Sequence, residues 1–329
     1  MSGYLPPGYR GPVNSNPNPP DGEARISIYG YRPSNIFAYV ATVIFGLSFI
    51  VHFSYLMISR GTRTFQILIV CGCAMEVGGY VVRILSHKNP FIVSYFVAQY
   101  FLIVVAPCFF SGTFYLALSN ALGRLPPNES RTLLPFGGKK LVIIFVIADT
   151  ITTIIQIAGA ALIGVAESSR TRGDPSSITP QQANDILLSG LALQCASFLC
   201  FYYLLITVAV RASKMSPRSL RKTFLAILSI TSFLVLTRTV KPTTCWTLRF
   251  GPIFSETYNF LSHTSQVYRL AETAEGIFGY ASSNEWLFGL LEFAPVALAV
   301  LFWAAVPLHK VLPEQSPQYH EGWEAKTEA

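Results

Sequence analysis

Seven stretches of mostly apolar residues occupy the chain between Ile36 and Leu308, and short polar segments separate them. Each stretch is about 20 residues long, the length at which a helix matches the roughly 30 Å hydrocarbon core of a bilayer. Helices at the surface of soluble domains instead carry a polar face. The pattern predicts an all-α polytopic membrane protein, a seven-transmembrane helix bundle with spans at residues 36–58, 65–85, 91–118, 141–165, 185–210, 222–240 and 286–308.

The segments outside the bundle have a different composition. Residues 1–35 are rich in Pro, Gly and Asn and lack a basic start followed by an apolar run, so they predict a disordered tail rather than a signal peptide. Residues 309–329 are predicted to form a second disordered tail. Over the whole chain 12% of residues are charged, against about 25% in soluble domains. This composition agrees with one transmembrane domain over residues 36–308.

Lysine and arginine are unevenly divided between the two sides of the predicted bundle. Cytoplasmic loops retain these residues, so their distribution indicates the orientation. One side collects 13 of the 24, namely Arg60, Arg63, Arg124, Arg131, Lys139, Lys140, Arg211, Lys214, Arg218, Arg221, Lys222, Lys310 and Lys326. We expect the N-terminus outside, the C-terminus in the cytosol and the sequon at Asn128 unglycosylated on the cytosolic side. The formal net charge of +7 is then mainly a topology signal and needs no nucleic-acid partner.

A few ionisable and amide side chains lie at membrane depth, where they are costly unless they face the bundle interior and find partners. The candidates are Glu76, Tyr80 and Arg83 on one stripe of the second span, Asp149 and Gln156 on the fourth, Gln194 on the fifth and Glu292 on the seventh. Interhelical hydrogen bonding explains any one of them, and Arg83 near a helix end can extend to the headgroups. Three carboxylates on three helices exceed what packing needs, so we expect some to line a polar cavity.

The sequence lacks the residues that several functions of membrane proteins require. An intramembrane zinc hydrolase needs about three converging His or acidic ligands, and of five histidines His52 alone lies at membrane depth. A retinal protein needs a lysine in its last span, and residues 286–308 contain none. No Gly-x-x-x-x-Gly-Lys-Ser/Thr phosphate loop is present. We therefore expect no enzyme, no metal site and no redox or nucleotide cofactor.

The order of these residues resembles the fungal RTA-like family, also called lipid-translocating exporters. The matching residues are Tyr31-x-Pro33 with Asn35, Glu76-x-x-Gly79-Tyr80-x-x-Arg83, Ala106-Pro107 with Tyr115 and Leu118, Asp149 with Gln156 and Gly159, Gly190 with Gln194, and Arg269-x-x-Glu272-x-x-x-Gly276 before Glu285. The resemblance covers residues 30–308. It implies seven helices in a fungal membrane and a role in moving lipids or lipophilic compounds, or in defence against them.

The chain departs from that pattern at one place. In the family an arginine that ends the sixth span is followed closely by the Arg-x-x-Glu segment, whereas here residues 241–267 intervene. Removing them places Arg238, Arg269 and Glu272 at i, i+4 and i+7, one helical stripe. The Val240 codon begins with GT and Gln266 can be encoded by CAG, which are usual intron ends. We interpret residues 241–267 as an unspliced intron; the alternative is a genuine irregular extracellular loop.

The leading functional hypothesis is a membrane exporter or translocase for amphipathic lipids of the sphingoid-base kind, or for lipophilic toxicants, in the plasma membrane. A cationic long-chain amine needs a desolvated anionic partner, for which Glu76, Asp149 and Glu292 are candidates. Arg83 and Arg269 would hold resting carboxylates or a phosphate-bearing headgroup. The alternative is a seven-helix receptor or sensor that binds such a lipid without moving it. The predicted substrate or pathway residues are Glu76, Tyr80, Arg83, Asp149, Gln156, Gln194, Arg269, Glu272 and Glu292.

Overall fold

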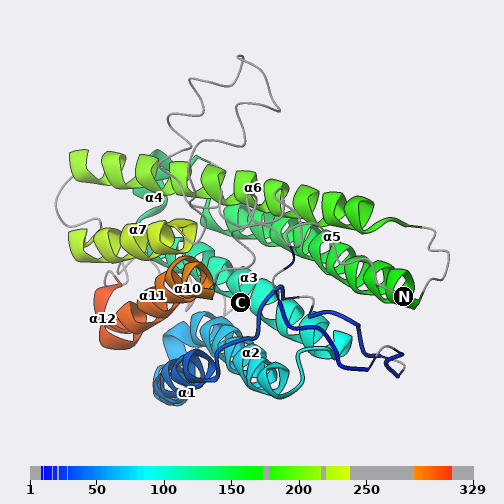
Figure 1. Cartoon of the computed structure of the whole chain (residues 1–329). Coiled ribbons are helices and arrows are strands. Elements are labelled where there is room, and N and C mark those ends of the chain that lie inside the picture. The colour runs from blue at the N-terminus through cyan, green and yellow to red at the C-terminus, as the bar shows by residue number, and fades with distance from the viewer. Residues whose placement is uncertain are drawn as a thin grey trace, which may run out of the picture.

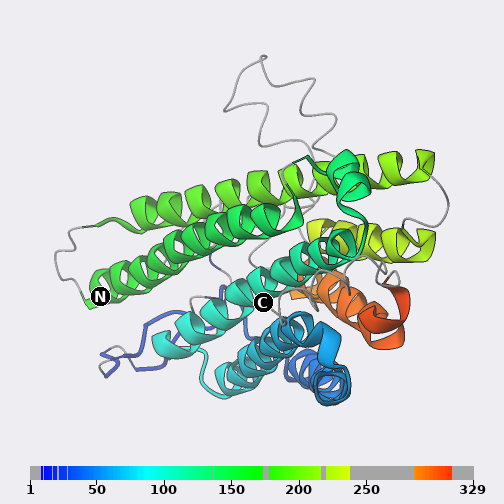
Figure 2. The same cartoon turned by 180° about the vertical axis from the view of Figure 1, so that it is seen from behind.

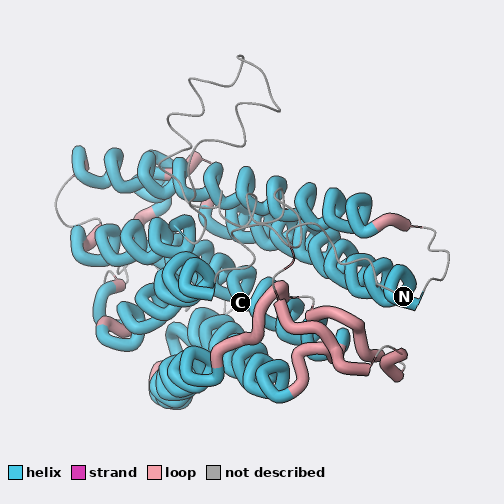
Figure 3. Tube along the Cα trace, viewed as in Figure 1, coloured by secondary structure: helices cyan, strands magenta, loops and turns pink. Residues whose placement is uncertain are grey.

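A computed structural model describes most of the chain, and the described residues are mostly helical (Figures 1 and 3). The residues that the structure describes are 9, 11–16, 18–20, 22–27, 29–135, 137–172, 178–215, 220–237 and 285–312. The long helices are α1 (Asn35–Ile58), α2 (Arg63–Lys88), α3 (Val93–Gly123), α5 (Gly138–Arg172) and α6 (Pro180–Lys214). The shorter ones are η1 (Arg60–Thr62), α4 (Pro127–Leu133), α7 (Lys222–Thr237), α10 (Glu285–Phe288), the π-helical turn η3 (Gly289–Phe293), α11 (Ala294–Ala305) and α12 (Leu308–Val311).

Five described helices, α1, α2, α3, α5 and α6, are long and apolar enough to cross a membrane. They coincide with the first five predicted spans and confirm a multi-pass, all-helical membrane protein. The predicted sixth and seventh spans correspond to α7 and to the continuous run from α10 through α11, which are shorter apolar helices. Seven spans and the orientation of the termini therefore stay predictions.

Helix α3 lies in the middle of the bundle, with α2 packed on one side and α5 on the other, as both views show (Figures 1 and 2). Helix α1 packs on the far side of α2, and α6 packs along α5. Helices α7 and α11 pack against each other beside these layers. Side chains that point to the middle of the bundle form one apolar core, in which Phe114, Tyr115, Phe201 and Trp303 are buried. The polar groups of α2 and α5 are thus separated by α3.

The outward faces of the long helices are apolar. On α5 the exposed residues Ile143, Ile147, Ile151 and Ile154 form a stripe with helical spacing. On α1 a similar stripe is exposed. In a soluble protein such faces would be covered, whereas lipid tails solvate them in a bilayer. Helices α5 and α6 pack closely at a glycine, because a Cβ at Gly159 of α5 would lie 2.6 Å from the Leu187 backbone nitrogen of α6.

The described part of the N-terminal segment differs from the expected disordered tail. It returns along the end of the bundle and pairs with the α2–α3 connection, where the Ala24 N–H donates to the Phe91 carbonyl at 2.8 Å and the Val93 N–H to Gly22 at 3.0 Å. Ala24 and Tyr29 are buried. Proline, glycine and asparagine suppress helix and strand here, but they do not prevent backbone hydrogen bonds to a neighbouring loop.

Three predicted features lie outside the described residues. They are the insert at residues 241–267, the site candidates Arg269 and Glu272, and the greater part of the predicted C-terminal tail, from residue 313 onward.

Candidate functional site

Most of the predicted site residues face the interior of the bundle. Glu76, Arg83, Asp149 and Glu292 are between 1% and 4% exposed, and Tyr80 and Gln156 are fully buried. Gln194 is half-buried. This burial agrees with an interior orientation, while their part in binding stays a prediction.

These residues do not form one cluster, because α3 separates those on α2 from those on α5. Two polar groups result. We call Tyr31, Ser34, Arg83 and Glu285 the clamp. We call Cys108, Tyr115, Asp149, Thr153, Gln156, Gln194 and Ser197 the α3–α5–α6 network.

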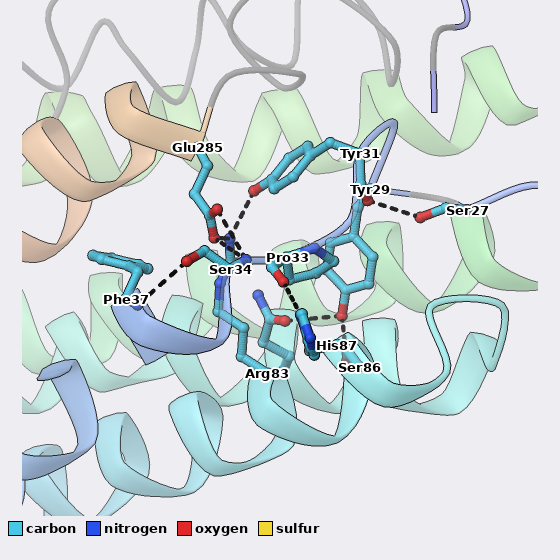
Figure 4. A network of polar contacts seen from close by, with 11 residues as sticks. Ser27, Tyr29, Tyr31, Pro33, Ser34, Phe37, Arg83, Ser86, His87 and Glu285 are labelled. Carbon is cyan, nitrogen blue, oxygen red and sulfur yellow. Dashed lines mark hydrogen bonds and ion pairs between the residues drawn. The ribbon is translucent and has the colours of Figure 1, made fainter. Parts of the chain in front are cut away.

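The clamp joins the N-terminal segment to α2 and α10 (Figure 4). Arg83 Nη2 donates to Glu285 Oε1 at 2.6 Å and to the Tyr31 hydroxyl at 2.7 Å. The Ser34 backbone N–H donates to both carboxylate oxygens of Glu285, at 2.8 and 2.9 Å. The Arg83 guanidinium also lies 4.6 Å from the centroid of the Phe288 ring, a cation–π contact. Arg83 is therefore held inside the bundle and does not extend to the headgroups, as one interpretation of the sequence allowed.

Further hydrogen bonds hold the same end of the bundle together (Figure 4). His87 Nδ1 lies 2.6 Å from the Pro33 carbonyl, to which it donates. The Tyr29 hydroxyl donates to Gln99 Oε1 at 2.8 Å and contacts Ser86 Oγ at 2.8 Å. Burial raises the pKa of Tyr29 well above its usual range, so it stays a neutral donor. The N-terminal segment is thus fixed at several points to the ends of α2 and α3.

The α3–α5–α6 network is centred on the carboxylate of Asp149. Its Oδ2 accepts a hydrogen bond from the Tyr115 hydroxyl of α3 at 2.8 Å, and its Oδ1 accepts one from Ser197 Oγ of α6 at 3.3 Å. Among the described residues the Arg83–Glu285 contact is the one ion pair, so no described cation lies beside Asp149. Two hydroxyls stabilise the charged carboxylate, but they do not neutralise it.

A chain of polar contacts continues from Asp149 along α5. The Thr153 hydroxyl donates to the Asp149 backbone carbonyl at 2.7 Å and lies 2.7 Å from Cys108 Sγ. Gln194 Nε2 donates to Cys108 Sγ at 3.0 Å, and Gln156 Nε2 donates to Gln194 Oε1 at 2.8 Å. The structure therefore links Asp149, Gln156 and Gln194 through Thr153 and Cys108.

The remaining acids, Glu76 and Glu292, are buried on α2 and in η3. Tyr80, one turn after Glu76, packs its ring against Phe45 at 5.9 Å and Phe293 at 5.9 Å between centroids. Glu292 belongs to the π-helical turn η3, in which the Ala294 N–H bonds to the Gly289 carbonyl five residues back. Such turns often occur at functional sites. Pro295 lacks an N–H and cannot donate to the helical ladder, which favours the wider turn just before it.

Sequence reasoning missed several contributors. Tyr31, Tyr115 and Glu285 stood among the family-like residues, yet nothing in their spacing indicated that they bond to Arg83 or Asp149. The structure also gives Cys108 of α3 side-chain hydrogen bonds to Thr153 and Gln194. Ser197 gave no signal except its place three residues after Gln194, on the same face of α6. Within the described residues no three His, Cys, Asp or Glu side chains gather as metal ligands would.

Comparison with known proteins identifies the family of this chain. The profile of the family described as RTA1 like protein matches residues 69–241 and 253–315. The chain belongs to this family. It is 28% identical over 288 residues to the sphingoid long-chain base transporter RSB1 of Saccharomyces cerevisiae, an alignment that covers 84% of this chain and 72% of the yeast protein.

Two further relatives come from the same yeast. Protoporphyrin uptake protein 1 is 23% identical over 235 residues, covering 70% of this chain and 64% of the relative. Protein RTM1 is 23% identical over 244 residues, covering 74% of this chain and 67% of the relative. No solved structure matches the chain.

Proposed function

We propose that this protein is a membrane exporter or translocase of amphipathic lipids resembling sphingoid bases, or of lipophilic toxicants, and that it confers resistance to them. The similarity to a protein named a sphingoid long-chain base transporter supports the substrate class. The observation that carries the proposal is Asp149, a carboxylate that is 4% exposed, held by hydroxyls from two other helices and lacking a cation among the described residues.

The chemistry of a long-chain base fits this carboxylate. Its ammonium group is expensive to move into hydrocarbon, and a carboxylate that is already desolvated supplies the counter-charge at that depth. Tyr115 and Ser197 hold the Asp149 oxygens in place before the ligand arrives, so little reorganisation accompanies binding. Glu76 and Glu292 are further candidates for the same role, and Tyr80, Gln156 and Gln194 would line the path. Arg269 and Glu272 remain candidates on the basis of the family resemblance alone.

The proposed arrangement in the membrane follows the charge distribution. We expect α7 and the run α10–η3–α11 to be the sixth and seventh spans, with the N-terminus outside, the C-terminus in the cytosol and the protein in the plasma membrane. The clamp then lies at the outer end of the bundle, because α2 runs from the cytosolic side outward to Lys88. The Asp149 carboxylate lies within α5, away from both ends of that helix.

Flux into vesicles tests the function. Purified protein is placed in phosphatidylcholine vesicles, and the inward and outward movement of a labelled long-chain base is followed against protein-free vesicles. We expect flux above the protein-free rate, and slower flux for the Asp149→Asn variant. A receptor would bind the base and give no added flux, so saturable binding without movement would contradict the proposal.

We also propose that residues 241–267 are an unspliced intron. The family profile leaves residues 242–252 unmatched, within this segment, which supports an insertion but does not define its ends. Sequencing of transcripts across the junction is expected to show a mature message without these codons. If every message retains them, the segment is a genuine loop.

A further inference from the structure

The α3–α5–α6 network ends in a buried acceptor without a donor. Gln156 is fully buried, and among the described residues its Oε1 has no hydrogen-bond partner. Leaving a buried polar atom unsatisfied is unfavourable, and such atoms are rare in folded proteins. The atom therefore needs an explanation in function or in structure.

The direction of the hydrogen-bond chain identifies this atom as the oxygen of the amide. The Thr153 hydroxyl has one hydrogen and donates it to the Asp149 backbone carbonyl, which accepts only. The Cys108 thiol must then donate to Thr153 Oγ1, which leaves Cys108 Sγ to accept from Gln194 Nε2.

Gln194 consequently turns its Oε1 toward Gln156. Gln156 must present its N–H₂ group to that oxygen, at 2.8 Å, and its own Oε1 is left at the open end of the chain. The backbone carbonyl of Asp149 thus fixes the orientation of two amides, whose oxygen and nitrogen atoms are otherwise hard to distinguish.

The surrounding helices leave room for this side chain. A Cβ at Gly190 of α6 would lie 2.8 Å from Gln156 Cγ and 3.1 Å from its backbone nitrogen. Any larger residue at position 190 would displace Gln156. The glycine lets the long amide lie between α5 and α6, where it reaches Gln194.

Gln156 also lies on the same face of α5 as Asp149. The two residues are seven positions apart, almost two full turns, which corresponds to about 10 Å along the helix axis. A headgroup that moves along α5 therefore meets first one group and then the other. The carboxylate interacts with its charge, and the amide oxygen interacts with a hydrogen-bond donor.

We infer that Gln156 Oε1 is a second binding site for the transported headgroup, after Asp149. It accepts a hydrogen bond and so selects amphiphiles that carry an N–H or O–H donor. This inference rests on the proposed function. Gln156 is closed to solvent in the present conformation, so the headgroup reaches it when α5 and α6 separate during transport. A quaternary ammonium carries the charge that Asp149 neutralises but has no hydrogen to donate to Gln156.

The binding of two probes distinguishes the effect of the headgroup charge from the effect of its hydrogen-bond donors. Octadecylamine and octadecyltrimethylammonium share chain length and charge, and their affinities are measured for the purified protein in phosphatidylcholine nanodiscs. We expect the wild type to prefer the primary amine. Gln156→Met keeps the side-chain length but removes the acceptor, and it should reduce that preference by about tenfold, the effect of one lost hydrogen bond to a charged group. Affinity for the trimethylammonium probe should not change.

The matched control is Gln66→Met, which removes another buried glutamine, one that contacts His52 between α1 and α2. It should leave the preference unchanged. A Gln156→Met protein with the wild-type preference, or with both affinities lowered equally, would overturn the inference, because Gln156 would then be satisfied by water or act only in packing. A wild type that binds neither probe would instead overturn the proposed function itself.

Discussion

The clamp and the α3–α5–α6 network lie on opposite sides of α3, and they balance charge in different ways. In the clamp Arg83 Nη2 lies 2.6 Å from Glu285 Oε1, and the Ser34 N–H adds one more donor, shared by both carboxylate oxygens. In the network Asp149 receives two hydroxyl donors and no described cation. A completed ion pair holds segments together, whereas an unneutralised carboxylate can accept a cation from outside.

This difference assigns separate roles to two sets of buried polar residues that look alike in sequence. The clamp connects segments separated by 202 residues, since Arg83 and Glu285 come from α2 and α10. It stabilises one end of the bundle. The network lies inside the bundle, and under the proposed function its carboxylate binds the cationic headgroup of the ligand. Substitutions in the clamp should therefore affect stability first, and substitutions in the network should affect transport first.

The largest effect is expected from Arg83→Met. It leaves Glu285 without its cation, and breaking one side of a buried ion pair costs about 3–5 kcal/mol. Thermal unfolding of the purified protein in detergent measures the loss. The double variant Arg83→Met with Glu285→Met should recover part of the stability, because no charge is left unpaired. An unchanged unfolding temperature for the single variant would show that the clamp is not a stabilising contact.

Asp149→Asn should show the opposite pattern. The amide oxygen still accepts from Tyr115, so the unfolding temperature should change little. Loss of a charged hydrogen bond of about 1.5–3 kcal/mol corresponds to roughly 10- to 100-fold slower flux of a long-chain base. The control is Asp185→Asn, which removes an exposed carboxylate from α6 and should leave flux unchanged. Equal flux in both variants would remove Asp149 from the proposed site.

A smaller effect is expected from removing one hydroxyl from the clamp and one from the α3–α5–α6 network. Tyr31→Phe and Tyr115→Phe each lose a hydrogen bond to a charged group, at 2.7 and 2.8 Å. Each should lower the free energy of unfolding by about 1–2 kcal/mol. Of the two variants, only Tyr115→Phe should slow flux, because it releases one oxygen of Asp149. If both variants slow flux equally, the clamp takes part in transport and the division of roles is wrong.

Removing the sequon at Asn128 should have no effect on the apparent mass of the protein. The proposed topology puts the clamp at the outer end, so Asn128 of α4 is expected on the cytosolic side and unmodified. Glycosidase treatment and the Asn128→Gln substitution should leave the electrophoretic mobility of the protein unchanged. A glycan at Asn128 would reverse the topology and place the clamp at the inner end.

The sequence predicted the helices better than it predicted the contacts between polar residues. Apolar length and periodicity are local properties, so four of the first five predicted spans begin within three residues of α1, α2, α3 and α5. Helices α3 and α5 extend five and seven residues past the predicted ends, and α6 begins five residues before its predicted span. The N-terminal segment was interpreted from composition as disordered, and its described residues instead pair with the α2–α3 connection. Composition reports local propensity, and it carries no information about a neighbour more than 60 residues away.

Interior burial of Glu76, Arg83, Asp149, Gln156 and Glu292 followed from the sequence, because an ionisable or amide side chain facing lipid has no means of paying its desolvation cost. Membership of a lipid-related family also followed from the order of its motifs. Only the tertiary structure decided which of these residues meet. It paired Arg83 with Glu285 across 202 positions and left Asp149 with hydroxyls alone. Partner choice depends on which helices pack on which, and α3 lies between the two groups.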